Sequence, residues 1–188
     1  MKKYKYNFLV SVAICEHNTD INYLRQAINS VLEQTYPNFE LILVDDCSKT
    51  NFYDEEFMTD KRIKVIKNEK NLGLANSRNV AINNARGKYV FIMDTDDICE
   101  RKRFEKQISY MEKHKNVVCA GSWVKLFGLR NIKQKYKIND TEYYRCCLFF
   151  GNSPTITNPS VILRREIFEN GKVCYDGNLY TAEDYDMW

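Results

Sequence analysis

The sequence predicts an α/β fold with a mainly parallel central sheet flanked by helices, in one domain spanning residues 1–188. In the amino-terminal half, short apolar runs of strand length alternate with segments whose apolar residues recur at helical spacing. Such alternation is typical of parallel strands joined by right-handed crossovers. With 188 residues, 44% of them hydrophobic, and a net charge of +3, the chain is large enough for one core.

The first predicted strand and helix lie before Pro37. Residues 8–14 form an apolar run of strand length. Asp20 is a suitable N-cap for the helix that follows, because its side chain can accept a hydrogen bond from the first helical turn. The apolar residues of this helix recur at helical spacing: Leu24, Ala27, Ile28, Val31 and Leu32.

Two further strands follow this helix, at residues 39–44 and 62–67. The first of them is apolar and ends in Asp45 and Asp46, whereas the second is more polar. Together with the first strand and helix they continue the alternating pattern.

A second helix and a fourth strand complete the amino-terminal half. The helix opens near residues 71–74, runs through roughly 75–85 and ends at Gly87. The strand at residues 89–93 is a continuous apolar run, which predicts that it is buried.

The carboxyl-terminal half has a less regular pattern, which predicts a mixed arrangement of strands. A helix near residues 101–114 is followed by a strand at 117–127, a basic stretch with β character at 132–138 and a tyrosine-rich helix at 140–150. Residues 181–188 resemble the first turn of an amphipathic helix with acids at its start. We therefore expect the domain to be truncated at its carboxyl-terminal end.

An acidic cluster directly follows the fourth predicted strand. Asp94, Asp96 and Asp97 are three carboxylates within four positions, and side chains two apart on an extended chain face the same way. Carboxylates this close would raise one another's pKa, whereas Mg²⁺ or Mn²⁺ would relieve the repulsion. Two other interpretations remain: an acidic turn that caps the next helix, and a phosphatase of the haloacid dehalogenase type with Asp94 as its nucleophile.

Other polar residues stand at the ends of the first two strands, namely Glu16, His17, Asp45 and Asp46. In an open, mainly parallel sheet, ligands bind beyond the carboxyl ends of the strands. The acidic cluster at residues 94–97 belongs to the same edge. The sequence therefore predicts a ligand site along this edge.

Composition excludes several classes of protein. No apolar run reaches the roughly 20 residues of a membrane span, and the amino terminus lacks a signal-peptide core, so a cytoplasmic location is expected. Seven cysteines without a Cys-x-x-Cys pair, and only two histidines, argue against a disulfide framework and a zinc site. The lysines are spread along the chain, which argues against nucleic acid as a partner, while the mild basicity suits an anionic ligand or a membrane surface.

Five blocks of sequence carry a resemblance to a known family: residues 11–18, residues 30–36 with 39–48, residues 71–79, residues 87–97 and residues 181–188. They resemble that family's strand ends, its Asp-x-Asp metal motif and its Glu-Asp block. Over nearly its whole length the chain looks like the catalytic domain of an inverting family 2 glycosyltransferase with the GT-A fold. The resemblance implies a nucleotide-sugar-binding half at residues 1–98 and an acceptor half at 99–188.

The resemblance implies that a nucleotide-diphosphate sugar, with a UDP-sugar favoured, binds at the first two strand ends. The contacting residues would be Glu16, His17, Asn18, Asp45 and Asp46. Asp46 would accept a hydrogen bond from the uracil imide N–H, and His17 would pack against the base. The family's usual turn has a Pro-Thr-Tyr type sequence where this chain has Cys15-Glu16-His17. The residues alone also allow Asp46 to be a strand-end cap and His17 a surface residue.

The resemblance also assigns the acidic cluster to Mn²⁺ or Mg²⁺ held against the donor diphosphate. Asp96 would be the principal ligand, helped by Asp94 or Asp97, and one of the three would bind the ribose. The cation would stabilise the charge that grows on the leaving nucleoside diphosphate. Thr95 would lie in the same donor site, and Arg78 would either reach this anionic region or pair with the acidic cluster.

On the acceptor side, the resemblance makes Asp184 the catalytic base and Glu183 its alternative, because inversion requires a carboxylate that takes the acceptor's proton. Without the resemblance, two acids at a helix start would simply interact with the helix dipole. Residues 158–160 resemble the acceptor-side segment. The implied acceptor is a glycan or lipid-linked saccharide in cell-surface polysaccharide synthesis, with peripheral contact at the inner face of the plasma membrane.

A non-catalytic protein is the main alternative, either a truncated domain that binds nucleotide or a subunit that contacts partners. Apolar area exposed at a broken carboxyl end would favour a homodimer. Intact nucleotide binding without turnover would support this alternative.

Overall fold

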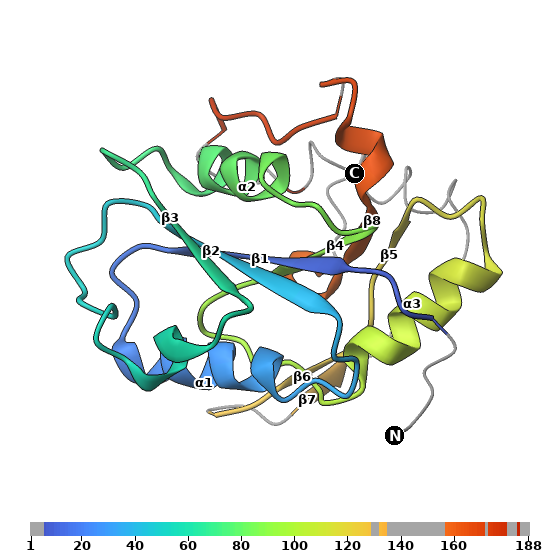
Figure 1. The fold of residues 1–188 in the computed structure, drawn as a ribbon, viewed down its shortest axis with the longest axis horizontal. Coiled ribbons are helices and arrows are strands. Elements are labelled where there is room, and N and C mark those ends of the chain that lie inside the picture. Colours follow the sequence, from blue (N-terminus) through green and yellow to red (C-terminus); the bar gives the residue numbers. More distant parts are fainter. Residues whose placement is uncertain (1–5, 129–131, 135–156, 172, 180–183, 185–188) are drawn as a thin grey trace.

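The computed structural model describes residues 6–128, 132–134, 157–171, 173–179 and 184, with 132–134 described by their backbone alone. A six-stranded sheet with the order β3-β2-β1-β4-β8-β5 forms its centre (Figure 1). The strands are β1 (Val10–Glu16), β2 (Phe39–Asp45), β3 (Ile63–Lys67), β4 (Tyr89–Met93), β5 (Cys119–Ala120) and β8 (Ile162–Arg164). The helices are α1 (Ile21–Leu32), α2 (Leu74–Asn83) and α3 (Arg103–Lys113).

The sheet is parallel in its first part and mixed in its second, as the sequence predicts. β1 pairs in parallel with both β2 and β4, and β2 pairs in parallel with β3. β8 is antiparallel to β4, and β5 is antiparallel to β8. Because β1 lies between β2 and β4, the residues at the carboxyl ends of these three strands are brought to one edge of the sheet.

Helices cover both faces of the sheet. Figure 1 shows α1 and α3 on one face and α2 on the other. Side chains alternate along β1, so that Val12 and Ile14 enter the apolar cluster of α1 and α3 while Ala13 enters the cluster of α2. Burial on both faces explains why the central strands are nearly continuous apolar runs. In the part of the chain that the structure describes, no helix has both the length and the apolar composition needed to cross a membrane.

Helix α1 begins as the sequence predicts. The Asp20 side chain accepts a hydrogen bond from the backbone N–H of Asn22 at 2.8 Å, which caps the first turn. The residues at helical spacing form the buried face of the helix: Leu24, Ala27, Ile28 and Val31.

The end of α1 fixes the segment that joins the acidic cluster to α3. Ser30 Oγ accepts a hydrogen bond from Cys99 N at 2.9 Å. Gln34 Nε2 donates to the Glu100 carbonyl at 2.9 Å, and Gln34 Oε1 accepts from Phe104 N at 3.2 Å. Residues 30–36 therefore fix in place the segment that follows the acidic cluster and leads into α3.

Gly87 does not end helix α2, contrary to the prediction. The helix ends at Asn83 with Asn84 as its C-cap, and Gly87 lies in the turn before β4. A Cβ atom on Gly87 would come within 2.4 Å of Ser11 N and 2.5 Å of Val10 C. Glycine is required here because the backbone of β1 passes too close for a side chain.

The structure differs from the prediction at two other places. A 3₁₀ helix, η1 (Glu56–Thr59), stands between β2 and β3 where a helix was expected. The strand expected at 117–127 is divided, because β5 joins the main sheet while β6 (Val124–Leu126) pairs with β7 (Ile132–Gln134) in a separate antiparallel sheet. The predictions for residues 135–138, 140–150 and 181–188 lie outside the described residues, except for Asp184, which is helical.

Candidate functional site

Polar side chains from three parallel strands reach the carboxyl edge of the sheet. Glu16 is the last residue of β1, Asp45 is the last residue of β2, and the two are register partners. Asp94 directly follows β4, the other neighbour of β1. The strand order thus places these carboxylates at one edge, and the contacts that each makes determine which of them are available to a ligand.

Glu16 is a buried carboxylate with one oxygen satisfied and the other not. Its Oε1 accepts hydrogen bonds from Thr19 N at 2.9 Å and from Ser48 Oγ at 3.1 Å. Its Oε2 has no hydrogen-bond partner, and among the described residues it is the one buried side-chain polar atom in that condition. An unsatisfied buried polar group costs about 1–3 kcal/mol. Glu16 Oε2 therefore retains an unused capacity to accept a hydrogen bond.

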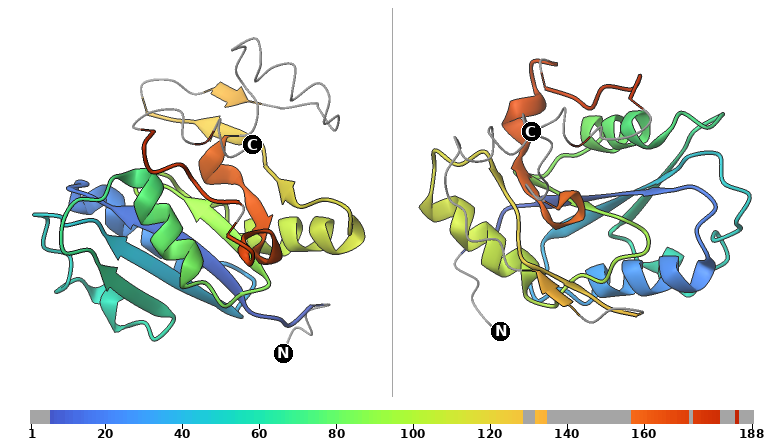
Figure 2. Two further views of the ribbon diagram at one scale, coloured as in Figure 1. Left: turned by 90° about the horizontal axis from the view of Figure 1, so that it is seen from above. Right: turned by 180° about the vertical axis from the view of Figure 1, so that it is seen from behind.

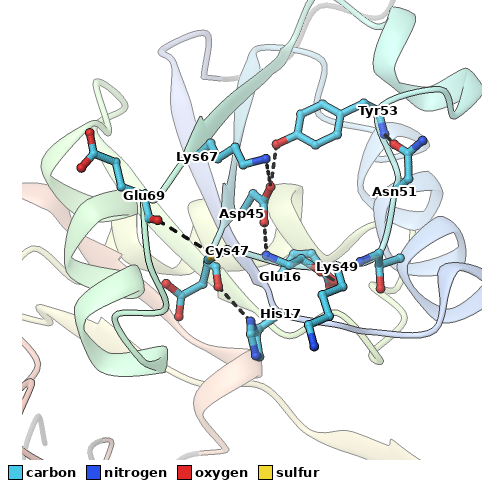
Figure 3. A network of polar contacts seen from close by, with 12 residues as sticks. Glu16, His17, Asp45, Cys47, Lys49, Asn51, Tyr53, Lys67 and Glu69 are labelled. Carbon is cyan, nitrogen blue, oxygen red and sulfur yellow. Dashed lines mark hydrogen bonds and ion pairs between the residues drawn. The ribbon is translucent and has the colours of Figure 1, made fainter.

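His17 is held in one orientation by three hydrogen bonds. Its Nδ1 lies 2.8 Å from the Asp46 carbonyl oxygen, and its Nε2 lies 3.0 Å from both Asn18 Nδ2 and Asn71 Nδ2. Because a carbonyl oxygen only accepts, Nδ1 carries the proton and Nε2 accepts from the two amides. The ring is exposed and lies at the border of the polar network in Figure 3. A base or sugar could pack against it without any rotation of the ring.

Asn18 joins the turn after β1 to the turn after β2. It adopts a φ of 57°, in the left-handed region that asparagine tolerates better than most residues. Its backbone N–H donates to Ser48 Oγ at 2.8 Å, and its Oδ1 accepts from Lys49 N at 2.7 Å. Its side chain thus supports His17 and the neighbouring turn together.

Asp45 is fully buried and holds the loop after β2. Its Oδ1 accepts from Ser48 N at 2.7 Å, and its Oδ2 accepts from the Tyr53 hydroxyl at 2.6 Å, with Lys67 Nζ at 3.8 Å (Figure 3). Burial and this hydrogen bond to a carboxylate raise the pKa of Tyr53 to about 12. The Asp45 side chain therefore stabilises the loop after β2, which borders the candidate site. Tyr53 and Lys67 were not among the predicted site residues, since no local pattern connects them to Asp45.

Asp46 anchors the loop that leads into α2. Its Oδ1 accepts from Asn68 Nδ2 and Leu72 N, both at 2.8 Å, and its Oδ2 accepts from Gly73 N at 2.9 Å. The geometry is that of a strand-end cap, which was the alternative interpretation of this residue. The contact with a uracil imide stays a prediction, because Oδ2 has a single donor and a carboxylate oxygen can accept a second.

The acidic cluster forms a turn and does not continue the strand. β4 ends at Met93, and the turn is closed by a weak Asp97 N to Asp94 O hydrogen bond of 3.5 Å. Within the described ranges, no group of three or more His, Cys, Asp or Glu side chains is arranged to hold a metal ion. The backbone turns directly after the strand, so Asp94 and Asp96 are not on an extended chain, and their convergence on one metal ion stays a prediction.

The carboxylates of the turn still influence one another. Burial, followed by the charges of Asp94 and Asp96, raises the pKa of Asp97 to about 6. Asp96 is exposed, whereas Asp94 and Asp97 are half-buried. Thr95 Oγ1 lies 2.8 Å from Thr19 Oγ1, and this contact joins the acidic turn to the turn after β1 that Glu16 holds. Thr19 thus connects the predicted donor-site residues Glu16 and Thr95.

Arg78 is a buried cation between the acidic turn and the acceptor-side segment. Its Nη2 donates to Asp94 Oδ1 at 2.9 Å, and its guanidinium carbon lies 5.4 Å from the centre of the Tyr175 ring. With the Asn158 amide oriented to satisfy both of its ends, Asn158 Oδ1 accepts from Arg78 at 2.8 and 3.1 Å while its nitrogen donates to Tyr175 Oη at 3.2 Å. Burial opposes the charge on Arg78, but the interactions with Asp94, Tyr175 and Cys15 together outweigh burial, so the pKa of the guanidinium lies above its ordinary value.

Asn158 begins the short 3₁₀ helix η2 (Asn158–Ser160), which precedes β8. The predicted acceptor-side segment is therefore linked through Arg78 to the acidic turn. Tyr175, which completes this link, was not predicted, because its position depends on contacts between distant parts of the chain.

The predicted base lies at the limit of what the structure describes. Asp184 is helical and half-buried, and Glu183 lies outside the described residues. A cavity of about 440 Å³ beside α3 contains none of the predicted site residues, its lining being Tyr6, Tyr36, Lys102, Glu105, Lys106, Ile108 and Ser109. The candidate site is the carboxyl edge of the sheet, and this cavity is separate from it.

Comparison with known sequences gives a consistent result. The sequence profile described as Glycosyl transferase family 2 matches residues 11–171. An uncharacterized glycosyltransferase of Methanocaldococcus jannaschii is 39% identical over 191 residues, which cover 96% of this chain and 63% of that protein. The Escherichia coli protein WfgD, named as a UDP-Glc:alpha-D-GlcNAc-diphosphoundecaprenol beta-1,3-glucosyltransferase, is 40% identical over 110 residues, 57% of this chain and 43% of its own. The chain thus spans less than two thirds of these relatives' length.

Solved structures share the fold. S. aureus TarS (residues 1–349) in complex with UDP superposes with a TM-score of 0.76 at 23% identity, over 94% of this chain and 52% of that one. The mannosyltransferase PcManGT of Pyrobaculum calidifontis, in complex with GDP-Man and Mn²⁺, gives a TM-score of 0.70 at 17% identity, over 97% of this chain and 51% of that one. At these identities the likeness shows the fold alone, and that fold is GT-A.

Proposed function

Because the chain belongs to glycosyl transferase family 2, we propose that it transfers a sugar, with inversion, from a nucleotide-diphosphate donor to a hydroxyl group of a glycan or lipid-linked saccharide. One observation carries this proposal. The turns after β1, β2 and β4 are joined by side-chain hydrogen bonds at the carboxyl edge of a GT-A sheet, where ligands of such sheets bind. Glu16, with its unsatisfied Oε2, lies at the centre of that edge.

The donor nucleotide would bind along the turns after β1 and β2. His17 offers a ring face whose orientation is already set, and Asp46 Oδ2 offers an acceptor for an imide N–H. Asn18 and Asp45 hold the turns in place from beneath. A UDP-sugar is the favoured donor, in keeping with the UDP of TarS, while the GDP-Man of PcManGT makes a guanosine donor the comparison to test.

We expect a divalent cation to bind at the acidic turn together with the donor. The carboxylates of the turn are hard oxygen ligands. Burial, followed by the charges of Asp94 and Asp96, raises the pKa of Asp97, and a cation would relieve the repulsion among the three carboxylates. Asp96, the exposed member, would be the principal ligand, helped by Asp94 or Asp97, and the donor diphosphate would supply further oxygens. Mn²⁺ or Mg²⁺ in this position would act as a Lewis acid toward the leaving nucleoside diphosphate. The ion pair with Arg78 holds the Asp94 side chain in position.

Asp184 would take the proton of the acceptor hydroxyl as the anomeric carbon is attacked, with Glu183 as the alternative base. A lipid-linked acceptor is supported by the relative WfgD, which is named for a diphosphoundecaprenol-linked acceptor. Synthesis of a cell-surface polysaccharide is the corresponding role. A phosphatase with Asp94 as its nucleophile is not favoured, because the family match supports glycosyl transfer.

The first test is a thermal-shift panel of UDP, GDP, TDP and CDP, each with and without Mn²⁺. A ligand that binds only the native state at 100 times its dissociation constant stabilises it by about 2.7 kcal/mol, which is visible as a rise in melting temperature. We expect a manganese-dependent shift with one nucleotide, UDP, that is lost in Asp96→Asn and kept in the control Glu33→Gln. Glu33 is an exposed carboxylate at the end of α1. No shift with any nucleotide would contradict the proposal.

A further inference from the structure

A segment beyond the family profile lies against helix α2. The profile match ends at residue 171, and the structure describes residues 173–179 after it. Figure 2 shows this segment in dark red beside α2, which is green. Tyr175 is the one buried residue of the segment, and its side chain belongs to the apolar cluster that α2 forms with the sheet. We refer to residues 173–179 as the α2 strap.

Asn79 of α2 binds the α2 strap with both ends of its side-chain amide. Its Nδ2 donates to the Tyr175 carbonyl oxygen at 2.8 Å, and its Oδ1 accepts from the Tyr175 N–H at 2.9 Å. Both backbone groups of Tyr175 are thereby satisfied, although this residue lies outside any helix or strand. Asparagine is a weak helix former, so these two bonds, rather than helix propensity, suit it to the middle of α2.

Asn76, one turn earlier on α2, connects the α2 strap to the loop before the helix. Residues three apart on a helix lie on the same face, so Asn76 and Asn79 both reach the strap. Asn76 Nδ2 donates to the Leu72 carbonyl oxygen at 2.8 Å and lies 3.4 Å from the Gly177 carbonyl oxygen. The Leu72 N–H in turn donates to Asp46. The strap is therefore attached to α2 at two points, and one of them adjoins the loop that Asp46 anchors.

Tyr175 connects the α2 strap to the acidic turn. Its ring centre lies 5.4 Å from the guanidinium carbon of Arg78, which is within the range of a cation–π contact. Its hydroxyl oxygen accepts a hydrogen bond from the Asn158 amide, whose oxygen accepts from Arg78. The Arg78 guanidinium donates to Asp94. Two of the groups that surround this buried cation therefore depend on the position of Tyr175.

We propose that Asn79 is a positioning residue of the glycosyl transfer site. Asn79 holds Tyr175 against Arg78, and Arg78 holds Asp94 in the turn that receives the metal ion and the donor diphosphate. Asn79 touches no reactant and acts only through these side chains. The assignment rests on the proposed function, because it takes Asp94 to belong to a metal and donor site. A purely structural residue would change the stability of the protein and leave the metal requirement of donor binding unchanged.

The experiment is a Mn²⁺ titration of the thermal shift that UDP induces, or GDP if the parent responds to that nucleotide instead. Asn79→Ala should raise the Mn²⁺ concentration at half-maximal shift by about three- to tenfold, below the 10–100-fold typical for direct partners of metal ligands. Tyr175→Phe keeps the ring over Arg78 but loses the bond to Asn158, and should raise it by a smaller factor. The matched control is Asn83→Ala, because Asn83 is an exposed asparagine of the same helix.

Hydrogen exchange reports on the α2 strap without any nucleotide. The Tyr175 N–H should exchange faster in Asn79→Ala than in the parent, since the variant removes the acceptor of that group. An unchanged exchange rate would show that Asn79 does not hold the strap and would overturn the proposal.

The outcomes separate this assignment from the proposed function. A parent without any metal-dependent shift would overturn both together. A parent that responds, with the same Mn²⁺ midpoint in Asn79→Ala and a lower melting temperature without ligand, would overturn the positioning role alone. A midpoint raised equally in Asn83→Ala would also overturn it, because the effect would then not depend on the strap. If Asn79→Ala does not fold, Tyr175→Phe decides: a raised midpoint supports the assignment and an unchanged one overturns it.

Discussion

Arg78 and Asp94 form an ion pair of 2.9 Å that ties helix α2 to the carboxyl end of β4, with Arg78 only 4% exposed and Asp94 34% exposed. The guanidinium also meets Asn158 and Tyr175 from the carboxyl-terminal half. One buried cation thus joins the acidic turn, the helix that precedes it and the predicted acceptor-side segment. Loss of this side chain would affect all three.

Replacement of Arg78 by glutamine should destabilise the protein more than replacement of a surface arginine. The change leaves the Asp94 carboxylate without its charged partner, and we expect the free energy of unfolding to fall by about 2–3 kcal/mol. Urea denaturation measures this difference. Arg25→Gln is the control, because it removes an ion pair with Glu55 that is far more exposed and should change the midpoint little. Equal midpoints for the two variants would contradict the structural role of Arg78.

Glu16→Gln should separate stability from nucleotide binding. Glutamine can still accept from Thr19 N and Ser48 Oγ with its oxygen, and it replaces the unsatisfied Oε2 by an NH₂ group. We expect a melting temperature equal to or above that of the parent, together with a smaller nucleotide-induced shift. If the shift is unchanged, no donor group binds to Oε2.

Asp184→Asn should abolish turnover without affecting the donor site. Removal of a general base typically lowers the rate by about 10²–10⁴-fold. The nucleotide-induced thermal shift should persist, because Asp184 is not among the predicted donor contacts. Glu183→Gln is the matched comparison. If that variant loses activity while Asp184→Asn keeps it, the two acids have been assigned in the wrong order.

Glu112 makes stability depend on acid pH. Burial alone would raise its pKa, but hydrogen bonds from Lys115, Lys88 and Tyr89 outweigh burial and lower the pKa from 4.5 to about 2. A carboxylate whose pKa is lower in the folded state stabilises the protein above its unfolded pKa. That contribution is lost as the pH falls from 4.5 toward about 2.

Unfolding free energies measured across this pH window test the role of Glu112. We expect Glu112→Gln to remove a pH-dependent stabilisation on the order of 1–2 kcal/mol, since solvent partly screens the two lysines. Glu33→Gln should leave the pH profile of the parent unchanged. The same slope in the parent and in Glu112→Gln would mean that other carboxylates dominate.

Gly87→Ala should destabilise the protein although the substitution is small. The added Cβ atom would lie 2.4–2.5 Å from the backbone of Ser11 and Val10, so β1 and the turn must move apart. Such overpacking typically costs about 1–3 kcal/mol. A lower melting temperature is expected, and a neutral or stabilising effect would mean that the turn can move away from β1 without cost.

Local pattern was sufficient for much of the fold. The limits of β4 agree with the predicted 89–93, and α1 has the predicted cap and the predicted buried face. Apolar spacing and capping residues act over a few positions, so a sequence displays them directly. The division of 117–127 into β5 and β6 was not predictable in this way, because it depends on which distant strand each segment pairs with.

The candidate site, like the fold, was predictable only in part from local sequence. The sequence by itself determined that Glu16, Asp45 and Asp94 stand at strand ends of a mainly parallel sheet, and therefore at one edge. Only the tertiary structure decided which of their oxygens are already bound. Asp46 is engaged by the loop before α2 and Asp94 by Arg78, while Glu16 Oε2 is left unsatisfied. Hydrogen-bond partners come from residues far apart in the chain, and their pairing is set by packing, which no local pattern records.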